Sequence, residues 1–276
     1  MEIRNVVFVW FLGASCLIMA QGQAKAMMYQ SRIGYLKQAV RNSSFGQLQF
    51  QDALTDTITK LQSFAELNVT EEHEDETQPT MSFPKCGVKD KDIPTDKRSK
   101  RFAYQGTHWT IKHLTYMISK YPSRLSKSET DSELLKAFSV WSAVSPLTFT
   151  QKRSVPVNIE IRFVRQWHGD GNPFDGPGGV LAHATPPSNN VSYVHFDKAE
   201  HWTINGHKGV NLFQVAAHEF GHVLGLSHSD KRSALMSTDY CGYRPDFQLD
   251  NDDIFAIQAL YGKRSKNTLI TPHLLF

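Results

Sequence analysis

Three histidines and one glutamate lie within a single stretch that runs His218-Glu219-Phe220-Gly221-His222-Val223-Leu224-Gly225-Leu226-Ser227-His228. The apolar residues before it favour a helix, so His218 and His222 fall one turn apart on one face and can bind the same cation. Gly225 can adopt the left-handed conformation that ends a helix, which lets His228 return as a third ligand. Three protein ligands leave one position of a tetrahedral zinc open, as in catalytic sites. Glu219 lies beside them, where a carboxylate can orient a water and accept its proton.

A second group of metal-binding residue types precedes this stretch. His168, Asp170, His183 and His195 can complete a tetrahedron with no open position, which predicts a structural zinc. The segment between them is rich in glycine, which lets backbone carbonyls approach a hard cation, and nearby carboxylates add oxygen ligands. These oxygens favour calcium, and the candidate calcium ligands are Asp175, Gly176, Gly178, Val180, Asp197 and Glu200.

The composition indicates a globular protein with one large domain or two modest ones. The 276 residues are 40% hydrophobic and 21% charged. The formal net charge is only +3, which lacks the strong positive field that nucleic-acid binding requires. Three cysteines exclude a disulfide scaffold, and twelve histidines point to metal instead.

The N-terminus is expected to be a secretion signal at residues 1–26. Arg4 precedes an apolar run over residues 6–20, which is shorter than the ~20 residues that a membrane span needs. An uncleaved anchor is the alternative, and no later stretch could span a bilayer. Ala24-Lys25-Ala26 fits a signal-peptidase site, with Ala20 as a rival. Secretion makes the triplets at Asn42, Asn68 and Asn190 candidate glycosylation sites.

Residues 27–101 are expected to be a helical segment that is removed from the mature protein. Apolar residues recur at spacings of three and four between Leu54 and Ala65, which predicts one apolar helical stripe. The acidic residues 71–80 then indicate an exposed connection. Arg98-Ser99-Lys100-Arg101 is a basic cluster of the kind that furin-type convertases cut, so we expect cleavage between Arg101 and Phe102.

After the leader, the sequence resembles the matrix metalloproteinases over nearly its whole length. Ser229 after the last histidine points to this branch of the metzincins, and Met236 resembles their Met-turn below the zinc. The further matching stretches are residues 64–70, 84–90, 114–116, 174–179, 181–184, 195–202, 252–254 and 258–262.

Removal of the leader leaves two cysteines, Cys86 and Cys241. They could form a disulfide in an oxidising compartment. The resemblance implies another role for Cys86, which is that of a cysteine switch whose thiolate takes the fourth zinc position and keeps the enzyme latent. It assigns no role to Cys241.

The resemblance implies an α+β fold. A metzincin catalytic domain at residues 102–262, with a twisted, mostly parallel five-stranded sheet and three helices, would follow a three-helix prodomain. Asp252 would pair with the new ammonium group of Phe102, and Asp253 would brace the Met-turn. Residues 263–276 would be a C-terminal tail, which predicts a minimal, matrilysin-like architecture without a hemopexin-like domain or its means of engaging triple-helical collagen.

Several residues depart from the family pattern near the zinc. Lys85 and Lys89 stand where the family has Arg and Pro, and because lysine cannot form a bidentate carboxylate pair, we expect a weaker latch. The resemblance assigns Gln214, Thr238 and Tyr240 to the S1′ pocket. The polar Gln214 predicts a shallower or more polar pocket than Leu would give.

Two further departures concern calcium. Asn158 and Tyr193 replace aspartates of the family's secondary calcium site, so that site is not expected. The calcium site at Asp175, Asp197 and Glu200 keeps its ligands.

Together these features predict a secreted, monomeric zinc endopeptidase, made as a latent zymogen, that cleaves proteins of the extracellular matrix or other extracellular proteins. Two zinc ions and at least one calcium ion are the expected cofactors. A furin-like convertase and, by resemblance, tissue inhibitors of metalloproteinases are the expected partners. A catalytically inactive zinc- and calcium-binding module is the alternative, against which Glu219 argues. A matrix adhesion protein is a third candidate, against which the lack of an appended module argues.

Overall fold

The computed structural model describes residues 84–88 and 106–265. These residues lie in one of the two compact units into which the chain divides. The expected signal peptide, the prodomain helices, the processing site at Arg101-Phe102 and most of the C-terminal tail lie outside the described residues. None of the described helices is both long and apolar enough to cross a membrane.

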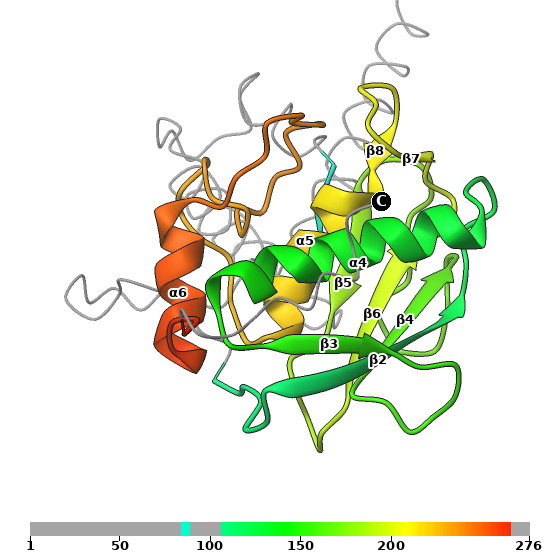
Figure 1. Cartoon of the computed structure of the whole chain (residues 1–276). Helices are drawn as coiled ribbons and strands as arrows, with labels where there is room; N and C mark the ends of the chain where they lie inside the picture. Colours follow the sequence, from blue (N-terminus) through cyan, green and yellow to red (C-terminus); the bar gives the residue numbers. More distant parts are fainter. Residues whose placement is uncertain (1–83, 89–105, 266–276) are drawn as a thin grey trace, which may run out of the picture. The chain divides into compact units, whose positions relative to one another are not determined.

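Six strands form one sheet with the order β1-β5-β6-β4-β2-β3 (Figure 1). Their pairings are parallel except for the antiparallel pair β5–β6. The strands are β1 (Lys85–Cys86), β2 (His113–Lys120), β3 (Thr148–Gln151), β4 (Ile159–Val164), β5 (Val180–Ala184) and β6 (Ser192–Asp197). A second, two-stranded parallel sheet consists of β7 (Trp202–Thr203) and β8 (Val210–Asn211).

Three helices complete the described fold: α4 (Lys127–Val144), α5 (Leu212–Val223) and α6 (Asn251–Tyr261). Each begins at a polar cap that accepts a hydrogen bond from a backbone N–H of the first turn. The caps are Ser126 and Asp250, which both form capping boxes, and Asn211. The three helices and the five strands β2 to β6 confirm the predicted α+β fold, and β1 adds a sixth strand from the segment around Cys86.

The core lies between the sheet and the helices, and it is built largely of aromatic rings. The ring of Phe138 on α4 stacks on Phe220 of α5, with 3.7 Å between the ring centroids, and it also contacts Tyr116 on β2 and Phe149 on β3. The indole Nε1 of Trp141 donates to the carbonyl of Ala217 on α5 at 2.9 Å. The metal-binding helix predicted by the histidine spacing is therefore held on a rigid, close-packed layer.

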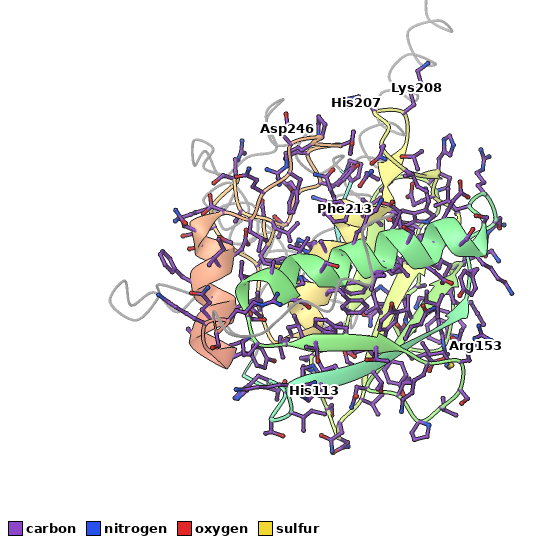
Figure 2. All side chains as sticks on the ribbon, in the orientation of Figure 1. His113, Arg153, His207, Lys208, Phe213 and Asp246 are labelled. Atoms are coloured by element: carbon purple, nitrogen blue, oxygen red, sulfur yellow. The ribbon has the colours of Figure 1, made fainter. Side chains whose placement is uncertain are left out.

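The loops on one side of this core extend outward. Figure 2 shows His207 and Lys208 at the outer end of the β7–β8 connection, and Asp246 on the loop that precedes α6. These two loops touch, because the ring of His207 lies 5.3 Å from that of Tyr243 and the Tyr243 hydroxyl bonds to Asn205 at 3.3 Å. This contact between the β7–β8 connection and Tyr243 supports the loop that follows Met236.

Helix α5 ends as the sequence predicts. Gly225 has φ +98°, in the left-handed region, and the Leu226 N–H donates to the Gly221 carbonyl at 3.0 Å. The turn also packs closely, since a Cβ added at Gly225 would lie 2.5 Å from the Thr107 carbonyl oxygen. Glycine is required here for both conformation and space.

We expect Gly225→Ala to lower the free energy of unfolding by at least ~2 kcal/mol, from the left-handed strain and the collision with Thr107. Gly106→Ala is the matched control, because Gly106 also has a positive φ of +89° but an added Cβ would meet no atom within 4 Å. Its cost should be about 1 kcal/mol. Thermal unfolding of both full-length variants measures the difference, and equal losses would contradict the role of the close contact.

Candidate active site and metal centres

The three predicted imidazole ligands converge. The Nε2 atom of His222 lies 3.1 Å from Nε2 of His218 and 3.1 Å from Nε2 of His228. The Nδ1 atom of His218 lies 2.7 Å from the Leu235 carbonyl, and that of His222 lies 2.8 Å from the Leu226 carbonyl. Because a carbonyl can only accept, both Nδ1 atoms carry the proton and both Nε2 lone pairs face the common centre.

Nitrogens that both present lone pairs cannot hydrogen-bond to each other, so this arrangement fits a bound cation. A tetrahedral zinc with Zn–N bonds of ~2.0–2.1 Å places its ligand nitrogens ~3.3 Å apart, close to the separations found. Burial, reinforced by the neighbouring His228, lowers the pKa of His218 to about 3 and that of His222 well below its usual range. Both imidazoles are therefore neutral at pH 7 and able to bind metal.

Cys86 lies at the fourth corner. Its Sγ atom is 3.4 Å from Nε2 of His222, and the ligand atoms of Cys86 and the three histidines all lie within 4.8 Å of one another. A tetrahedral zinc with three nitrogens and one sulfur places sulfur and nitrogen ~3.5 Å apart, so the thiol fits the same cation. No disulfide joins Cys86 to Cys241, which is exposed.

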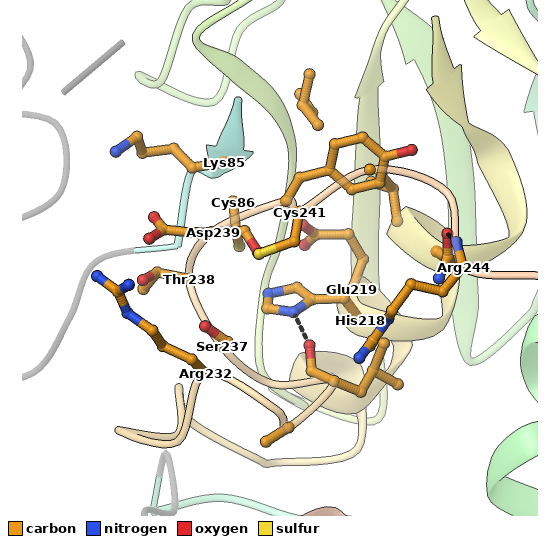
Figure 3. Close-up of a pocket in the computed structure, with 17 residues that line it drawn as sticks. Lys85, Cys86, His218, Glu219, Arg232, Ser237, Thr238, Asp239, Cys241 and Arg244 are labelled. Carbon is orange, nitrogen blue, oxygen red and sulfur yellow. Dashed lines mark hydrogen bonds between the residues drawn. The ribbon is translucent and has the colours of Figure 1, made fainter. Parts of the chain in front are cut away.

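Glu219 is buried next to this centre. It has no exposed surface, and neither carboxylate oxygen finds a hydrogen-bond partner among the described residues. Burial raises the pKa of the Glu219 carboxyl to about 8, while the nearby Cys86 thiol acts in the opposite direction. Figure 3 shows Cys86, His218 and Glu219 gathered around one cleft. A carboxyl buried this completely is costly to ionise, which is typical of a group kept for proton transfer.

The Met-turn residue packs directly below the histidine helix. Met236 is buried, and a Cβ added at Gly221 of α5 would collide with its Sδ atom. The carboxylate of Asp253 accepts hydrogen bonds from the backbone N–H groups of Leu235 at 2.7 Å and Met236 at 3.1 Å. Asp253 thus has the bracing contacts that the resemblance implies, and Leu235 also supplies the carbonyl that orients His218.

The second histidine cluster is equally compact. Oδ2 of Asp170 lies 2.9 Å from Nε2 of His168, 2.7 Å from Nε2 of His183 and 2.8 Å from Nδ1 of His195. Nε2 of His183 lies 3.4 Å and 3.3 Å from the nitrogens of the other two histidines. Burial lowers the pKa of His195 to about 4, so this imidazole is neutral at pH 7. Four ligand atoms at tetrahedral spacing fit a zinc with no open position.

The six candidate calcium ligands lie on the glycine-rich loop before β5, at the first residue of β5, and at and just after the C-terminal end of β6. Each of the three carboxylates accepts one backbone N–H of the glycine-rich segment: Asp197 from Gly176 at 3.2 Å, Glu200 from Gly178 at 2.6 Å, and Asp175 from Val180 at 3.2 Å. Burial and the nearby Asp197 and Asp175 raise the pKa of Glu200 to about 7. A divalent cation would relieve this crowding of like charges, although the three carboxylates do not converge within 4.8 Å as the histidine clusters do.

The two residues that replace the aspartates of the family's secondary calcium site make other contacts or face solvent. Oδ1 of Asn158 accepts hydrogen bonds from the backbone N–H of Thr115 at 2.9 Å and from its hydroxyl at 3.0 Å. The Tyr193 side chain is exposed. Asn158 therefore links β2 to the start of β4.

A cleft lies beside the histidine centre. Its volume is about 540 Å³ when the part that is open to solvent is counted. Its lining brings together the predicted pocket residues Gln214, Thr238 and Tyr240 with His218, Glu219 and Cys86. Sequence reasoning missed Arg244, which also lines the cleft and whose backbone N–H donates to Oε1 of Gln214 at 2.9 Å. No local pattern signals this contact, because it joins residues 30 positions apart.

Two imidazoles from one buried helix, a third from the turn after it and an adjacent buried carboxyl form the type of site found in zinc-dependent hydrolases. The sequence profile of the matrixin family matches residues 108–262. The chain therefore belongs to the matrixins, a family of zinc metalloendopeptidases.

Individual relatives agree with this assignment. The chain is 40% identical to matrix metalloproteinase-19 of Mus musculus over 87% of its length, and 48% identical to stromelysin-3 of Xenopus laevis over 65%. It is 44% identical to the interstitial collagenase of Sus scrofa over 76%. The aligned parts cover 44%, 39% and 43% of these relatives, so the chain spans less than half of their length.

If both histidine clusters bind zinc, the full-length protein should retain two zinc ions per chain after dialysis, and His222→Ala and His183→Ala should each leave one. Zinc quantified by atomic emission tests this. His113→Ala is the control, because His113 is exposed, bonds to Thr148 and lies outside both clusters. Two ions in His183→Ala would refute the second centre.

Proposed function

We propose that this chain is a secreted zinc endopeptidase, made as a latent precursor, that hydrolyses internal peptide bonds of extracellular proteins. The observation that carries the proposal is the convergence of three imidazoles beside the buried Glu219, with the Cys86 thiol at the remaining corner. The names of the relatives, which include a collagenase and a stromelysin, support extracellular matrix proteins as the substrate class.

Glu219 is the proposed proton carrier. His218, His222 and His228 would hold a zinc ion, which would supply a Lewis acid for the peptide carbonyl and make an adjacent water more acidic. A Glu219 oxygen then accepts a proton from the attacking water and later delivers it to the nitrogen of the leaving amine. Burial favours the neutral form of this carboxyl, so its ionised form is a strong base toward the attacking water, and the proton that it gains can be passed on to the leaving amine.

The edge of β5 that faces β1 is the proposed binding place for an extended substrate. In the structure this edge pairs with the segment around Cys86: Lys85 N–H donates to the Gly179 carbonyl at 2.9 Å and Gly87 N–H to the Ala182 carbonyl at 2.7 Å. A substrate strand would replace these bonds with its own backbone hydrogen bonds. The side chain after the scissile bond would then enter the cleft lined by Gln214, Thr238 and Tyr240.

The same segment is the proposed source of latency. Besides its bonds to β5, it pairs with the opposite wall, where Cys86 N–H donates to the Thr238 carbonyl at 3.2 Å and Tyr240 N–H to the Pro84 carbonyl at 2.9 Å. It therefore blocks both the substrate edge and the fourth metal position. Cleavage between Arg101 and Phe102 by a furin-like convertase would free residues 27–101 to leave.

The remaining expectations belong to this proposal. The cluster of His168, Asp170, His183 and His195 would hold a structural zinc, and the loop with Asp175, Asp197 and Glu200 a calcium ion, both of which fix the loop above β5. The mature N-terminus at Phe102 would pair with Asp252. The apolar leader supports secretion through a signal peptide at residues 1–26, and secretion makes the triplets at Asn42, Asn68 and Asn190 candidate glycosylation sites. A monomeric state and tissue inhibitors of metalloproteinases as partners complete the proposal.

Glu219→Ala should keep its zinc and lose at least ~10²-fold in kcat/KM, because general acid–base catalysis contributes typically 10²–10⁴-fold. Hydrolysis of a fluorogenic peptide by the processed protein measures the rate, and zinc analysis of the same sample is the control. Near-normal turnover with bound zinc would contradict the role of Glu219.

The latency proposal predicts that Cys86→Ser makes the uncleaved precursor active, because a hydroxyl is a far weaker zinc ligand than a thiolate. Cys241→Ser is the matched control and should stay as silent as the wild-type precursor. Peptidase assays on precursors with an intact Arg101–Phe102 bond compare the three proteins. A silent Cys86→Ser precursor that becomes active after cleavage would show that another contact maintains latency.

A further inference from the structure

We infer that Tyr261, the last residue of α6, is a positioning residue for two of the three imidazoles of the histidine centre. Its hydroxyl holds the turn between His222 and His228 in place through the backbone carbonyl of Leu224. Tyr261 belongs to neither metal-binding cluster, so it acts on the metal through the backbone alone. The inference rests on the zinc site of the proposed function and adds to it the contact that keeps the third ligand in position.

The carbonyl groups at the end of α5 show how this turn is held. The last four carbonyls of a helix have no partner within the helix and must find one elsewhere. The His222 carbonyl accepts the Gly225 N–H at 2.9 Å, within the turn itself. The next two carbonyls, those of Val223 and Leu224, accept hydrogen bonds from side chains of other segments.

These two donors come from the segment before β2 and from the end of α6. The indole Nε1 of Trp109 donates to the Val223 carbonyl at 2.9 Å. The Tyr261 hydroxyl donates to the Leu224 carbonyl at 2.7 Å, and its oxygen accepts the Trp109 backbone N–H at 3.1 Å. Both donor residues are buried, so the linked hydrogen bonds are shielded from water and are strong.

The Tyr261 hydroxyl keeps the proton that it donates. Burial raises the pKa of Tyr261 to about 12, while the hydrogen bond from Trp109 acts in the opposite direction. The hydroxyl is therefore neutral throughout the pH range around 7. Because its oxygen faces the Trp109 N–H, its single proton is committed to the Leu224 carbonyl.

The turn that Tyr261 holds determines the geometry of two imidazoles. The Leu226 carbonyl lies 2.8 Å from Nδ1 of His222 and so decides which ring nitrogen faces the centre. His228 follows two residues later. Between the Leu224 and Leu226 carbonyls the chain has only a glycine, whose backbone is the least restricted of all residues. The turn therefore depends on being fixed from outside.

Helix α6 thus positions all three imidazoles, from its two ends. In its first turn, Asp253 accepts the backbone N–H of Leu235, whose carbonyl orients His218. At its last residue, Tyr261 holds the turn that carries the other two ligands. The two contacts act on different turns, so each can be removed without loss of the other.

Tyr261→Phe removes the hydroxyl and keeps the ring. In the full-length chain, we expect the histidine centre to bind zinc about tenfold more weakly, the lower end of the loss caused by removing an outer partner of a metal ligand. The zinc of the second cluster should be unaffected, and His222→Ala identifies which ion is which. Competition with a chelator measures both affinities. An affinity of the histidine centre within about twofold of the wild-type value, or an equal loss at both clusters, would overturn the inference.

Tyr121→Phe is the matched control. The Tyr121 hydroxyl donates to Oδ1 of Asp131 at 2.8 Å, close to the length of the Tyr261 bond, and neither residue belongs to a metal-binding cluster. This variant loses the same atom and should bind both zinc ions as the wild type does. Trp109→Phe removes the other donor and should weaken the same ion as Tyr261→Phe. A zinc loss in Tyr121→Phe as large as that in Tyr261→Phe would count against a specific role.

Amide hydrogen exchange in the zinc-free, full-length chain separates this inference from the proposed activity. The Leu226 N–H, which donates to the Gly221 carbonyl, should exchange at least about tenfold faster in Tyr261→Phe, because the turn opens locally. The Leu235 N–H, which donates to Asp253, should keep its wild-type rate. If the wild-type chain binds no zinc at the histidine centre, the proposed activity fails, yet faster exchange at Leu226 alone still supports the inference. Equal exchange at Leu226 in both proteins would overturn it, whatever the activity.

Discussion

The site depends on one constraint, which is that three imidazole nitrogens must present lone pairs to one point inside the protein. His218 and His222 meet it because α5 is buried and because the carbonyls of Leu235 and Leu226 hold the protons on the opposite ring nitrogens. Burial alone would make these imidazoles neutral, but only the carbonyls determine which nitrogen faces inward. The metal affinity of the site is therefore set by backbone groups of the turns after α5 as much as by the ligands.

Those turns are positioned by contacts that bind no metal. Asp253 on α6 fixes the backbone of Leu235 and Met236. Burial raises the pKa of the Asp253 carboxyl to about 6, although the three backbone N–H groups that donate to it act to lower this pKa. Gly225 provides the reversal that returns His228, while Phe138 and Trp141 anchor α5 from the opposite side. A change at any of these residues acts on the metal through the backbone, which makes the site and the stability of the fold inseparable.

The sequence predicts what is encoded locally. The spacing of His218 and His222, the helix around them and the left-handed Gly225 follow from residues within one segment, and the structure has them. The matrixin resemblance extends this to the mostly parallel sheet, the three helices and the contacts of Asp253. The bond between Gln214 and Arg244, and the carbonyl partners of the histidines, join segments through tertiary packing, for which no local pattern exists. Expectations for the prodomain helices and the processing site concern residues that the structure does not describe, and they remain predictions.

The segment around Cys86 makes two kinds of interaction, backbone hydrogen bonds and a contact of the Cys86 thiol with the histidine cluster. The strengths of the two depend on different conditions. Its backbone pairs with β5 on one side and with residues 238–240 on the other, in bonds that any side chain at Lys85 would allow. The Cys86 thiol, in contrast, needs a metal ion and a deprotonated sulfur. Since a substrate strand competes for the same edge of β5, the backbone pairing alone is exchangeable with substrate. In the proposed latent form the thiol would add a soft ligand for the metal, carried by a segment that the backbone pairing already holds in place. The replacement of Arg by Lys at position 85 changes a side chain of this segment and leaves both its backbone pairing and its thiol contact in place.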